Sequence, residues 1–347
     1  MRRKYWVIVV AIPVLLVAAE VAYWRVAAER LRTGYQAWLA DRVAHGWKVG
    51  SGPLSIGGWP QAATLTVPNL TLRHVGPAIP GDLDVASAGI TLSVSVLSPN
   101  TLQLFLTGPV HVRVGRMPDV IVTADETSVA VPLRQSGPLS IALHASGLRL
   151  EPSAGNWHMT AGLLNAETEV LADTPADQSQ PAVTFTLSSE AIALPAGIKW
   201  PLGSNISSFS ADGRLNGPLP DTGDVTRWAE AWRDGGGSLE ITHLALGWGP
   251  LGLTSSATLA LDDQLQPMGS GNGRIVGYAE TLDRMAAAGM LTRSAATAAK
   301  AVLSLMAGTS DADEPSAVDV PLTLQYRTLS MRQVPLVRLP EVDWPGQ

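Results

Sequence analysis

Histidine is the residue type from which a search for chemistry in this sequence starts, because it binds metals and transfers protons near neutral pH. None of the six histidines has a second histidine or a carboxylate at the spacing of a zinc motif such as HExxH. They are scattered along the chain: His45, His74, His111, His144, His158 and His243. His111 and His243 lie in or beside alternating segments, where a surface histidine is ordinary. We therefore expect no metal site.

Other candidate motifs are incomplete. The run Gly269–Gly273 (GSGNG) is neither the GxSxG of a nucleophile elbow nor the GxGxxG of a dinucleotide site, and it predicts a flexible turn. Asp262-Asp263 and Asp311-Asp313-Glu314 fall in expected turns, and calcium needs a fuller set of oxygen ligands. The chain has no Cys, which excludes thiolate sites and disulfides. We expect a non-enzymatic protein with no cofactor and no catalytic residues.

The composition favours a β-rich chain that does not bind nucleic acid. Of its 347 residues, 16% are charged, while 33 are Gly and 25 are Pro, which is typical of short strands joined by turns. The net charge of −6 is unsuited to a nucleic-acid backbone, which requires a concentrated basic surface. The length allows one large β domain or two ordinary ones.

The most apolar stretch is Tyr5–Trp24, which follows Arg2, Arg3 and Lys4. About twenty helical residues cross a hydrocarbon core of about 30 Å. A cleavable signal peptide ending near Val17–Ala19 is the alternative, but the apolar pattern continues past that site. We expect residues 1–24 to be a single-pass anchor in a bacterial inner membrane. The N-terminus is expected in the cytoplasm and the main domain in the periplasm.

Residues 25–46 predict a stem helix that Gly46 ends. Its apolar face carries Ala28, Leu31, Tyr35, Trp38 and Leu39, whereas Glu29, Arg30, Arg32 and Asp41 lie elsewhere. We expect this face to pack on a β-rich body. Binding flat on the membrane surface is the alternative.

From Trp47 onward, apolar and polar residues alternate as in strands that have one apolar face. Ala63, Leu65 and Val67 begin this pattern, and Pro68 shifts it so that Leu70 and Leu72 follow. Further strands are predicted at Leu92–Val96, Leu102–Leu106, Val110–Val114, Val129–Leu133, Leu139–Leu143, Leu148–Leu150, Trp157–Leu164 and Val183–Leu187, and within 239–261, 274–276 and 320–340. Turns are predicted at Ser98–Asn100, Gly108-Pro109 and Gly137-Pro138, and polar loops at Thr174–Gln180 and Thr309–Ser316.

Two helical segments interrupt the strands. Asp224–Asp234 is a short helix whose Trp228 and Trp232 we expect to plug one end of the sheet. Residues 278–307 predict a helix hairpin interrupted by Gly289 and covering an apolar sheet face. The residues that mark its two helices are Tyr278, Leu282 and Met285, then Ala295, Ala299, Val302 and Met306.

The expected fold is mainly β, with an extended curved antiparallel sheet (a half-barrel or super-roll) after the transmembrane and stem helices. Residues 47–347 form the β-rich domain, and a short echo between 52–60 and 237–250 suggests two halves, 47–217 and 237–347. The apolar face of the sheet must be covered. Either the two halves and the hairpin close over it, or a groove remains that accepts acyl chains.

The order of these features resembles an uncharacterised family of membrane-anchored envelope proteins of Gram-negative bacteria, catalogued as domain of unknown function 2125. The resemblance rests on the anchor and on Gln36–Leu39, Ile56–Pro60, Leu282–Ala307, Val320–Leu322 and Val334–Leu336. Gln61 stands where the family usually has Phe, and the cysteines of many members are absent. The resemblance implies a periplasmic β fold, transfers no catalytic residue, and extends at fold level to sheet-rich envelope proteins that handle lipids.

These features together predict an inner-membrane-anchored periplasmic protein of envelope biogenesis that holds lipid acyl chains in an apolar sheet groove. Its expected partners are the inner membrane, through Tyr5–Trp24, and a lipid or an envelope protein. The alternative is a scaffold or assembly factor for an envelope protein complex. A hydrolase is the third and least favoured interpretation.

Overall fold

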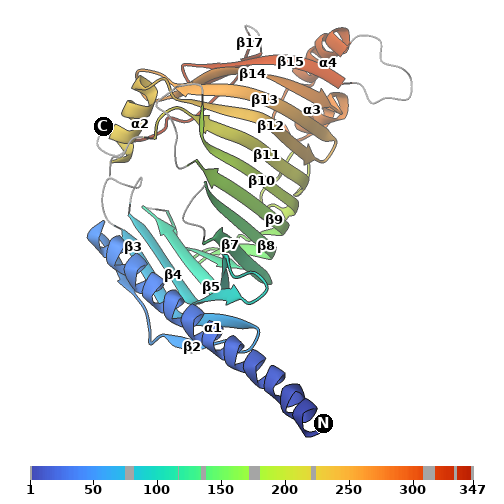
Figure 1. Cartoon of the computed structure of the whole chain (residues 1–347). Coiled ribbons are helices and arrows are strands. Elements are labelled where there is room, and N and C mark those ends of the chain that lie inside the picture. The colour runs from blue at the N-terminus through green and yellow to red at the C-terminus, as the bar shows by residue number, and fades with distance from the viewer. Residues whose placement is uncertain are drawn as a thin grey trace.

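A computed structural model of the chain describes residues 2–74, 82–115, 117–133, 138–171, 180–219, 224–307, 317–331 and 334–344. For residues 2–14, 16 and 334–337 it describes the backbone alone. Figure 1 shows one long helix beside a sheet whose strand direction turns progressively along the molecule, with three shorter helices at the far part of the sheet. The predicted 174–179 part of one polar loop, the whole Thr309–Ser316 loop and Gly137 lie outside the described residues.

The long helix, α1, runs without interruption from Arg2 to Ala44 over 43 residues. It ends just before Gly46, whose φ of +83° suits glycine and allows the chain to turn into the sheet. Within the described residues, no helix is both long enough and apolar enough to cross a lipid bilayer. Most side chains of the stretch Tyr5–Trp24 lie outside the described part of the chain.

The predicted mainly β fold is confirmed. The sheet begins with the short strands β1 (Trp47–Gly50) and β2 (Ser55–Gly57), which both pair with β3. The other strands are β3 (Ala62–His74), β4 (Leu83–Ser95), β5 (Thr101–Val114), β6 (Val120–Thr123), β7 (Glu126–Pro132), β8 (Leu139–Pro152), β9 (Met159–Val170), β10 (Pro181–Ala193), β11 (Asn205–Asn216), β12 (Ser238–Trp248), β13 (Leu251–Leu261), β14 (Pro267–Val276), β15 (Ala317–Gln325), β16 (Thr328–Met331) and β17 (Val334–Arg338).

All described pairings are antiparallel, and nearly all join strands that are consecutive in sequence. The exceptions are the pairing of β1 with β3 and the pairings around β5, which pairs with β7 near its start and with β6 near its end. Both short strands then pair with β8. The result is one meandering sheet that runs from β3 to β17 through residues 47–217 and 237–338.

One face of this sheet is apolar across almost its whole width. Residues that pair directly across an antiparallel ladder point to the same face. One row of such partners crosses twelve strands in register: Leu65, Leu92, Leu104, Val129, Leu143, Ala166, Leu187, Ala211, Leu244, Ser255, Gly273 and Val320. We call the surface that contains this row the apolar face.

The opposite surface, the polar face, carries mainly hydroxyl, amide and charged groups. A row adjacent to the first passes through Thr64, Ser93, Gln103, Ala130, Ala142, Glu167, Thr186, Asp212 and His243. The alternation that the sequence predicts is therefore real. It separates the two faces of one sheet instead of defining the inside of a closed body.

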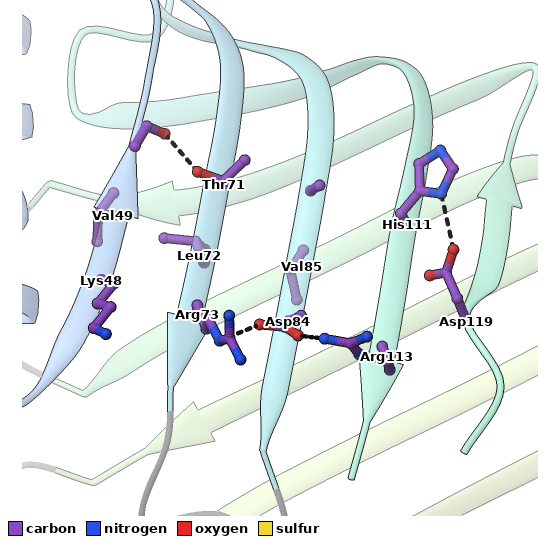
Figure 2. A pocket seen from close by; sticks show the side chains of 12 residues that line it. Lys48, Val49, Thr71, Leu72, Arg73, Asp84, Val85, His111, Arg113 and Asp119 are labelled. Carbon is purple, nitrogen blue, oxygen red and sulfur yellow. Dashed lines mark hydrogen bonds and ion pairs between the residues drawn. The ribbon is translucent and has the colours of Figure 1, made fainter. Parts of the chain in front are cut away.

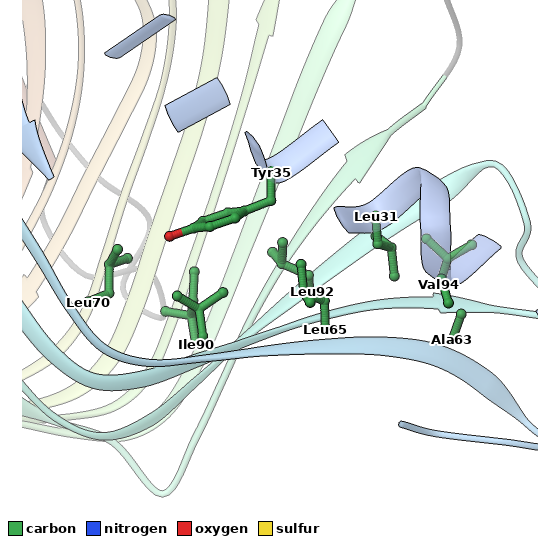
Figure 3. Close-up of a cluster of buried hydrophobic side chains, with 10 residues drawn as sticks. Leu31, Tyr35, Ala63, Leu65, Leu70, Ile90, Leu92 and Val94 are labelled. Carbon is green, nitrogen blue, oxygen red and sulfur yellow. The ribbon is translucent and has the colours of Figure 1, made fainter. Parts of the chain in front are cut away.

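Buried cores lie at the two ends of the apolar face. At one end α1 packs on β3 and β4 through Ala28, Leu31 and Tyr35, so the stem helix packs on the sheet as predicted (Figure 3). At the other end α4 covers Val318 and Val320 of β15. Between these cores the row residues from Val129 to Ser255 are partly exposed.

The accessible surface of the chain fits this open arrangement. The chain exposes 21233 Å², whereas a compact monomer of 36.5 kDa exposes about 13,500 Å². A second layer covers the sheet at its ends and leaves its middle partly open.

Several expected turns are strand residues instead. Gly108-Pro109 lies inside β5, where Gly108 has a φ of +74° and the register with β4 shifts, so this glycine makes a bulge. Gly269–Gly273 is the centre of β14 and pairs on both sides. A Cβ on Gly269 would lie 2.1 Å from the carbonyl oxygen of Thr258, so glycine here serves close strand packing. The segments Leu139–Leu143 and Leu148–Leu150 form one strand, β8, that passes through Gly147.

The shift of pattern at Pro68 is confirmed. Buried positions of β3 change from odd to even numbers between Val67 and Leu70, and Asn69 between them has a φ of +51°. A residue in this left-handed conformation reverses the side to which the next side chains point. Leu70 therefore joins the same buried cluster as Leu65.

The shorter helices match the sequence in position. Helix α2 is Val225–Asp234, and its buried Trp232 donates from Nε1 to the carbonyl oxygen of Asn216, 3.0 Å away, at the end of β11. Trp228 stacks on Trp232 with ring centroids 5.9 Å apart. The two indoles thus close the connection between β11 and β12.

Helices α3 (Tyr278–Ala287) and α4 (Arg293–Ala307) form the expected hairpin. Tyr278, Leu303 and Met306 contact the apolar face of β14 and β15. The prediction that Val302 lies on the packed face is wrong, because Val302 is half exposed. Leu303, the next residue on the helix, packs on the sheet in its place, whereas Met306 packs there as predicted.

Candidate functional site

The candidate site is a groove of about 880 Å³ between α1 and the apolar face of the sheet. Its floor consists of Ile90, Leu92 and Val94 of β4 and Leu102 and Leu104 of β5. These side chains point to one face because alternate residues of a strand do so. This volume falls in the range of about 300 to 1,000 Å³ that is usual for small-molecule sites.

The wall of the groove is α1 between Tyr23 and Trp38. Leu31 and Tyr35 are buried against the strands and hold the helix on the sheet (Figure 3). They lie four residues apart, so they share one helix face. Trp38, at the far end of this wall, stacks on Tyr35 with ring centroids 5.9 Å apart and remains 38% exposed.

Gly34 keeps part of this wall open. It lines the groove, and a Cβ built on it would meet nothing within 4 Å. Glycine in the middle of a helix costs up to about 1 kcal/mol relative to alanine. No close packing requires glycine here, and its effect is to leave a gap between α1 and β5.

Polar groups are few in the groove. Arg30 and Asn100 lie in the lining, and Arg30 is exposed. The hydroxyl of Tyr35 is buried, and within the described residues it has no hydrogen-bond partner. Leaving such a group unpaired costs about 1 to 3 kcal/mol. The groove is therefore an apolar trough with one cation at its margin, which suits the binding of a hydrocarbon chain.

A second groove, of about 660 Å³, lies on the polar face (Figure 2). Asp84 of β4 stands between two arginines of the neighbouring strands, and it forms ion pairs with Arg73 and Arg113. The Arg73 Nε to Asp84 Oδ1 distance is 3.2 Å. The two arginines are about half exposed and Asp84 is partly exposed, and solvated ion pairs of this kind contribute little to stability.

His111 and Asp119 also border this second groove. Asp119 Oδ2 lies 3.2 Å from His111 Nδ1. Within the described residues the other ring nitrogen has no hydrogen-bond partner. Asp119 can therefore orient the His111 ring on the surface of the sheet.

The structure does not bring the histidines together. His144 pairs with Asn165 at 2.6 Å, His45 contacts Asp41 in the last turn of α1, and buried His74 lies against Trp47. His243 and His158 are exposed. In the part of the chain that the structure describes, no three potential metal-binding side chains cluster.

The acidic pair Asp262-Asp263 occupies a turn, as expected. Asp262 Oδ1 accepts hydrogen bonds from the backbone N–H groups of Gln264 and Gln266, at 2.9 and 2.8 Å. The carboxylate is therefore used to hold the turn between β13 and β14. The second acidic group, Asp311-Asp313-Glu314, lies outside the described residues.

Sequence reasoning missed two residues of the candidate site. It placed Arg30 away from the apolar face of the stem helix, whereas Arg30 lines the groove. It did not single out Gly34, although a glycine one turn from both Leu31 and Trp38 marks a gap in an apolar helix face. The helical spacing shows that Gly34 leaves a gap in this face. Whether the gap lines a groove depends on which strand packs against the helix.

Comparison with known proteins identifies the family of the chain but no individual relative. No curated protein and no solved structure matches the chain. A family model described as an uncharacterised protein conserved in bacteria (DUF2125) matches residues 24–340, which include the whole described sheet and every residue of the groove lining except Tyr23. The chain therefore belongs to the DUF2125 family of uncharacterised bacterial proteins.

Proposed function

We propose that this chain is a non-enzymatic protein of the bacterial envelope that holds a lipid acyl chain in the groove between α1 and the sheet. In this proposal residues 1–24 anchor it in the inner membrane and the β-rich domain lies in the periplasm. The sheet curves around its apolar face as a half-barrel, so that bound hydrocarbon is shielded from water.

The observation that carries the proposal is the continuity of the apolar face. It runs in register from Leu65 to Val320, it is buried at both ends, and it is partly exposed between them. A continuous apolar surface of a soluble domain marks a site for another apolar body. The groove beside α1 is the place where this face is best enclosed.

The position of α1 supports delivery from a membrane. The helix that carries the apolar stretch Tyr5–Trp24 is the same helix that forms the groove wall, and Tyr23 lines the groove. With Tyr5–Trp24 in the bilayer, the groove would begin at the membrane surface. A lipid would then enter it without crossing open water.

Lipid exchange with a blocked groove tests the proposal. Gly34→Trp places an indole in space where a Cβ meets no neighbour, so it fills the groove without disturbing the buried contacts of Leu31 and Tyr35. The full chain, purified in detergent, is mixed with labelled phospholipid, and bound lipid is measured by native mass spectrometry. We expect the wild type to retain lipid and Gly34→Trp to lose most of it.

Two variants control for side effects. Gly34→Ala improves the helix and adds one methyl group, so it should keep lipid binding. Ala37→Trp adds the same indole at an exposed position of α1 outside the groove lining. Equal lipid retention by the wild type and Gly34→Trp would exclude the groove as the binding site. A lipid-free wild type with a stable crosslinked protein partner in membranes would favour the scaffold role instead.

A further inference from the structure

The groove contains one feature that an apolar chain alone does not explain, the guanidinium of Arg30. Among the described residues that line the groove, Arg30 alone carries a charge. It forms no ion pair with any described carboxylate. Other arginines of the chain, such as Arg73, Arg113 and Arg214, do have such partners.

The described lining of the groove offers Arg30 no anion. One turn away on α1 lie Val26, Ala27 and Gly34, which are uncharged, and the opposing strand presents Leu102 and Leu104. An arginine in such a place lays its aliphatic stem along the apolar surface and keeps its charge at the water-facing margin. The guanidinium is therefore available to an incoming anion.

We propose that the groove selects lipids with an anionic head group, which Arg30 binds while the acyl chain lies on Leu92 and Leu104. This inference rests on the proposed function and names the class of lipid. A guanidinium makes two parallel hydrogen bonds to a phosphate or carboxylate, and it is less strongly hydrated than an ammonium group. Asn100, in the same lining, is a neutral donor for the remaining oxygens.

The dimensions of the groove agree with this assignment. The groove wall from Tyr23 to Trp38 is about 22 Å long at 1.5 Å per residue. One leaflet of a bilayer, half of a hydrocarbon core of about 30 Å, is shorter than this wall. With the head group beside Arg30, about 12 Å of this wall remains as far as Trp38, so most of an acyl chain that spans one leaflet lies along the wall and its end extends beyond Trp38.

The test compares head groups of different charge on the full-length chain in detergent. Binding of labelled phosphatidylglycerol, phosphatidylethanolamine and palmitate is measured for the wild type, Arg30→Gln, Arg30→Lys and Arg32→Gln. We expect the wild type to bind phosphatidylglycerol about tenfold more tightly than phosphatidylethanolamine. The ammonium group of phosphatidylethanolamine competes with Arg30 for the phosphate, and a hydrogen bond to a charged group is worth about that factor. Arg30→Gln should lose this preference, so that its affinity for phosphatidylglycerol falls to its affinity for phosphatidylethanolamine.

The other variants separate a specific contact from general attraction. Arg30→Lys keeps the charge and should keep part of the preference. Arg32→Gln removes the same charge from an exposed position that does not line the groove. This variant should keep the full preference for phosphatidylglycerol. Palmitate that binds with the same dependence on Arg30 shows that a carboxylate serves as well as a phosphate.

Equal affinity of the wild type for phosphatidylglycerol and phosphatidylethanolamine would overturn this inference and leave lipid holding intact. Equal losses in Arg30→Gln and Arg32→Gln would also overturn it. Failure of every lipid to bind the wild type would remove the proposed function as well.

Discussion

The indole of Trp24 donates a hydrogen bond from Nε1 to the carbonyl oxygen of Gly57, 3.1 Å away. This bond joins α1 to β2 across 33 residues of sequence, and Trp24 also packs against the buried cluster beneath the helix. It fixes the helix at the point where the groove begins. The width of the groove depends on the position of α1 relative to the sheet, and this bond helps to fix that position.

Removing this bond should loosen α1. Trp24→Phe keeps an aromatic ring and loses the donor, and a hydrogen bond of this kind contributes about 0.5 to 1.5 kcal/mol. We expect a decrease of that size in the free energy of unfolding, measured by denaturant titration. Trp38→Phe is the matched control, because within the described residues the Trp38 indole N–H has no hydrogen-bond partner. Equal destabilisation by both variants would contradict the role of the Gly57 bond.

The two environments of the apolar face should respond differently to the same truncation. Leu65 is 0% exposed in the α1 cluster, so Leu65→Ala creates a cavity and should cost about 2 to 5 kcal/mol. Leu244 points to the same face but is partly exposed, so Leu244→Ala should cost less than about 1.5 kcal/mol. Chemical denaturation of both variants measures the difference. A cost for Leu244 as large as that for Leu65 would mean that the middle of the face is covered.

Much of the sheet was predictable because strand alternation is a local property. The residues Ala63, Leu65 and Val67 show it directly, and the helix hairpin at 278–307 follows from its spacing and from Gly289. Glycine was the main source of error. Gly108 and Gly269–Gly273 resemble turns in sequence, but each is compatible with a strand where a bulge or a close neighbour requires the absence of a side chain.

The candidate site was harder to predict because it is a relationship between distant elements. The sequence shows that α1 and β4 each have an apolar face, and it does not show that Arg30 and Gly34 border the line where these faces meet. Only the register from β3 to β15 reveals that the apolar residues form one face. Periodicity identifies strands, whereas the pairing of strands identifies a surface.

The N-cap of α2 offers a test of the indole pair at the end of the sheet. Asp224 Oδ1 accepts hydrogen bonds from the backbone N–H groups of Thr226 and Arg227, at 2.9 and 3.3 Å. Asp224→Ala should cost about 0.5 to 2 kcal/mol. Because α2 carries Trp228 and Trp232, the near-ultraviolet circular dichroism of the stacked rings should weaken as well.

Asp224→Asn is the control for this prediction. Asparagine caps helices about as well as aspartate, so this variant should remain within about 0.5 kcal/mol of the wild type. An unchanged dichroism signal in Asp224→Ala would show that the indoles are held by the sheet alone. In that case Trp232 and its bond to Asn216 would be sufficient to close the connection between β11 and β12.

The ion pair between Arg214 and Glu240 predicts a dependence of stability on pH. The two residues are register partners on β11 and β12, and the guanidinium donates to both carboxylate oxygens at 2.8 and 2.9 Å. These hydrogen bonds are the main cause that lowers the pKa of Glu240, and the positive charge of Arg214 adds to them. The same contact raises the pKa of Arg214, which is already charged at any usual pH.

The sign of the effect follows from the lowered pKa of Glu240. The stabilising contribution is complete above the pKa of glutamate in the unfolded chain, about 4.3. It declines as the pH falls from that value, and it is gone once the pH lies below the lowered pKa of the folded state. The difference in unfolding free energy between the wild type and Glu240→Gln should therefore be constant near neutral pH and shrink in acid.

Denaturant titrations between pH 7 and pH 3 measure this difference. The pair is solvent-exposed, so the effect is small and should weaken further in concentrated salt. Arg214→Gln should show the same narrowing toward the wild type in acid, since either change removes the pair. A difference that stayed constant down to pH 3 would mean that the carboxylate of Glu240 gains nothing from Arg214 in solution.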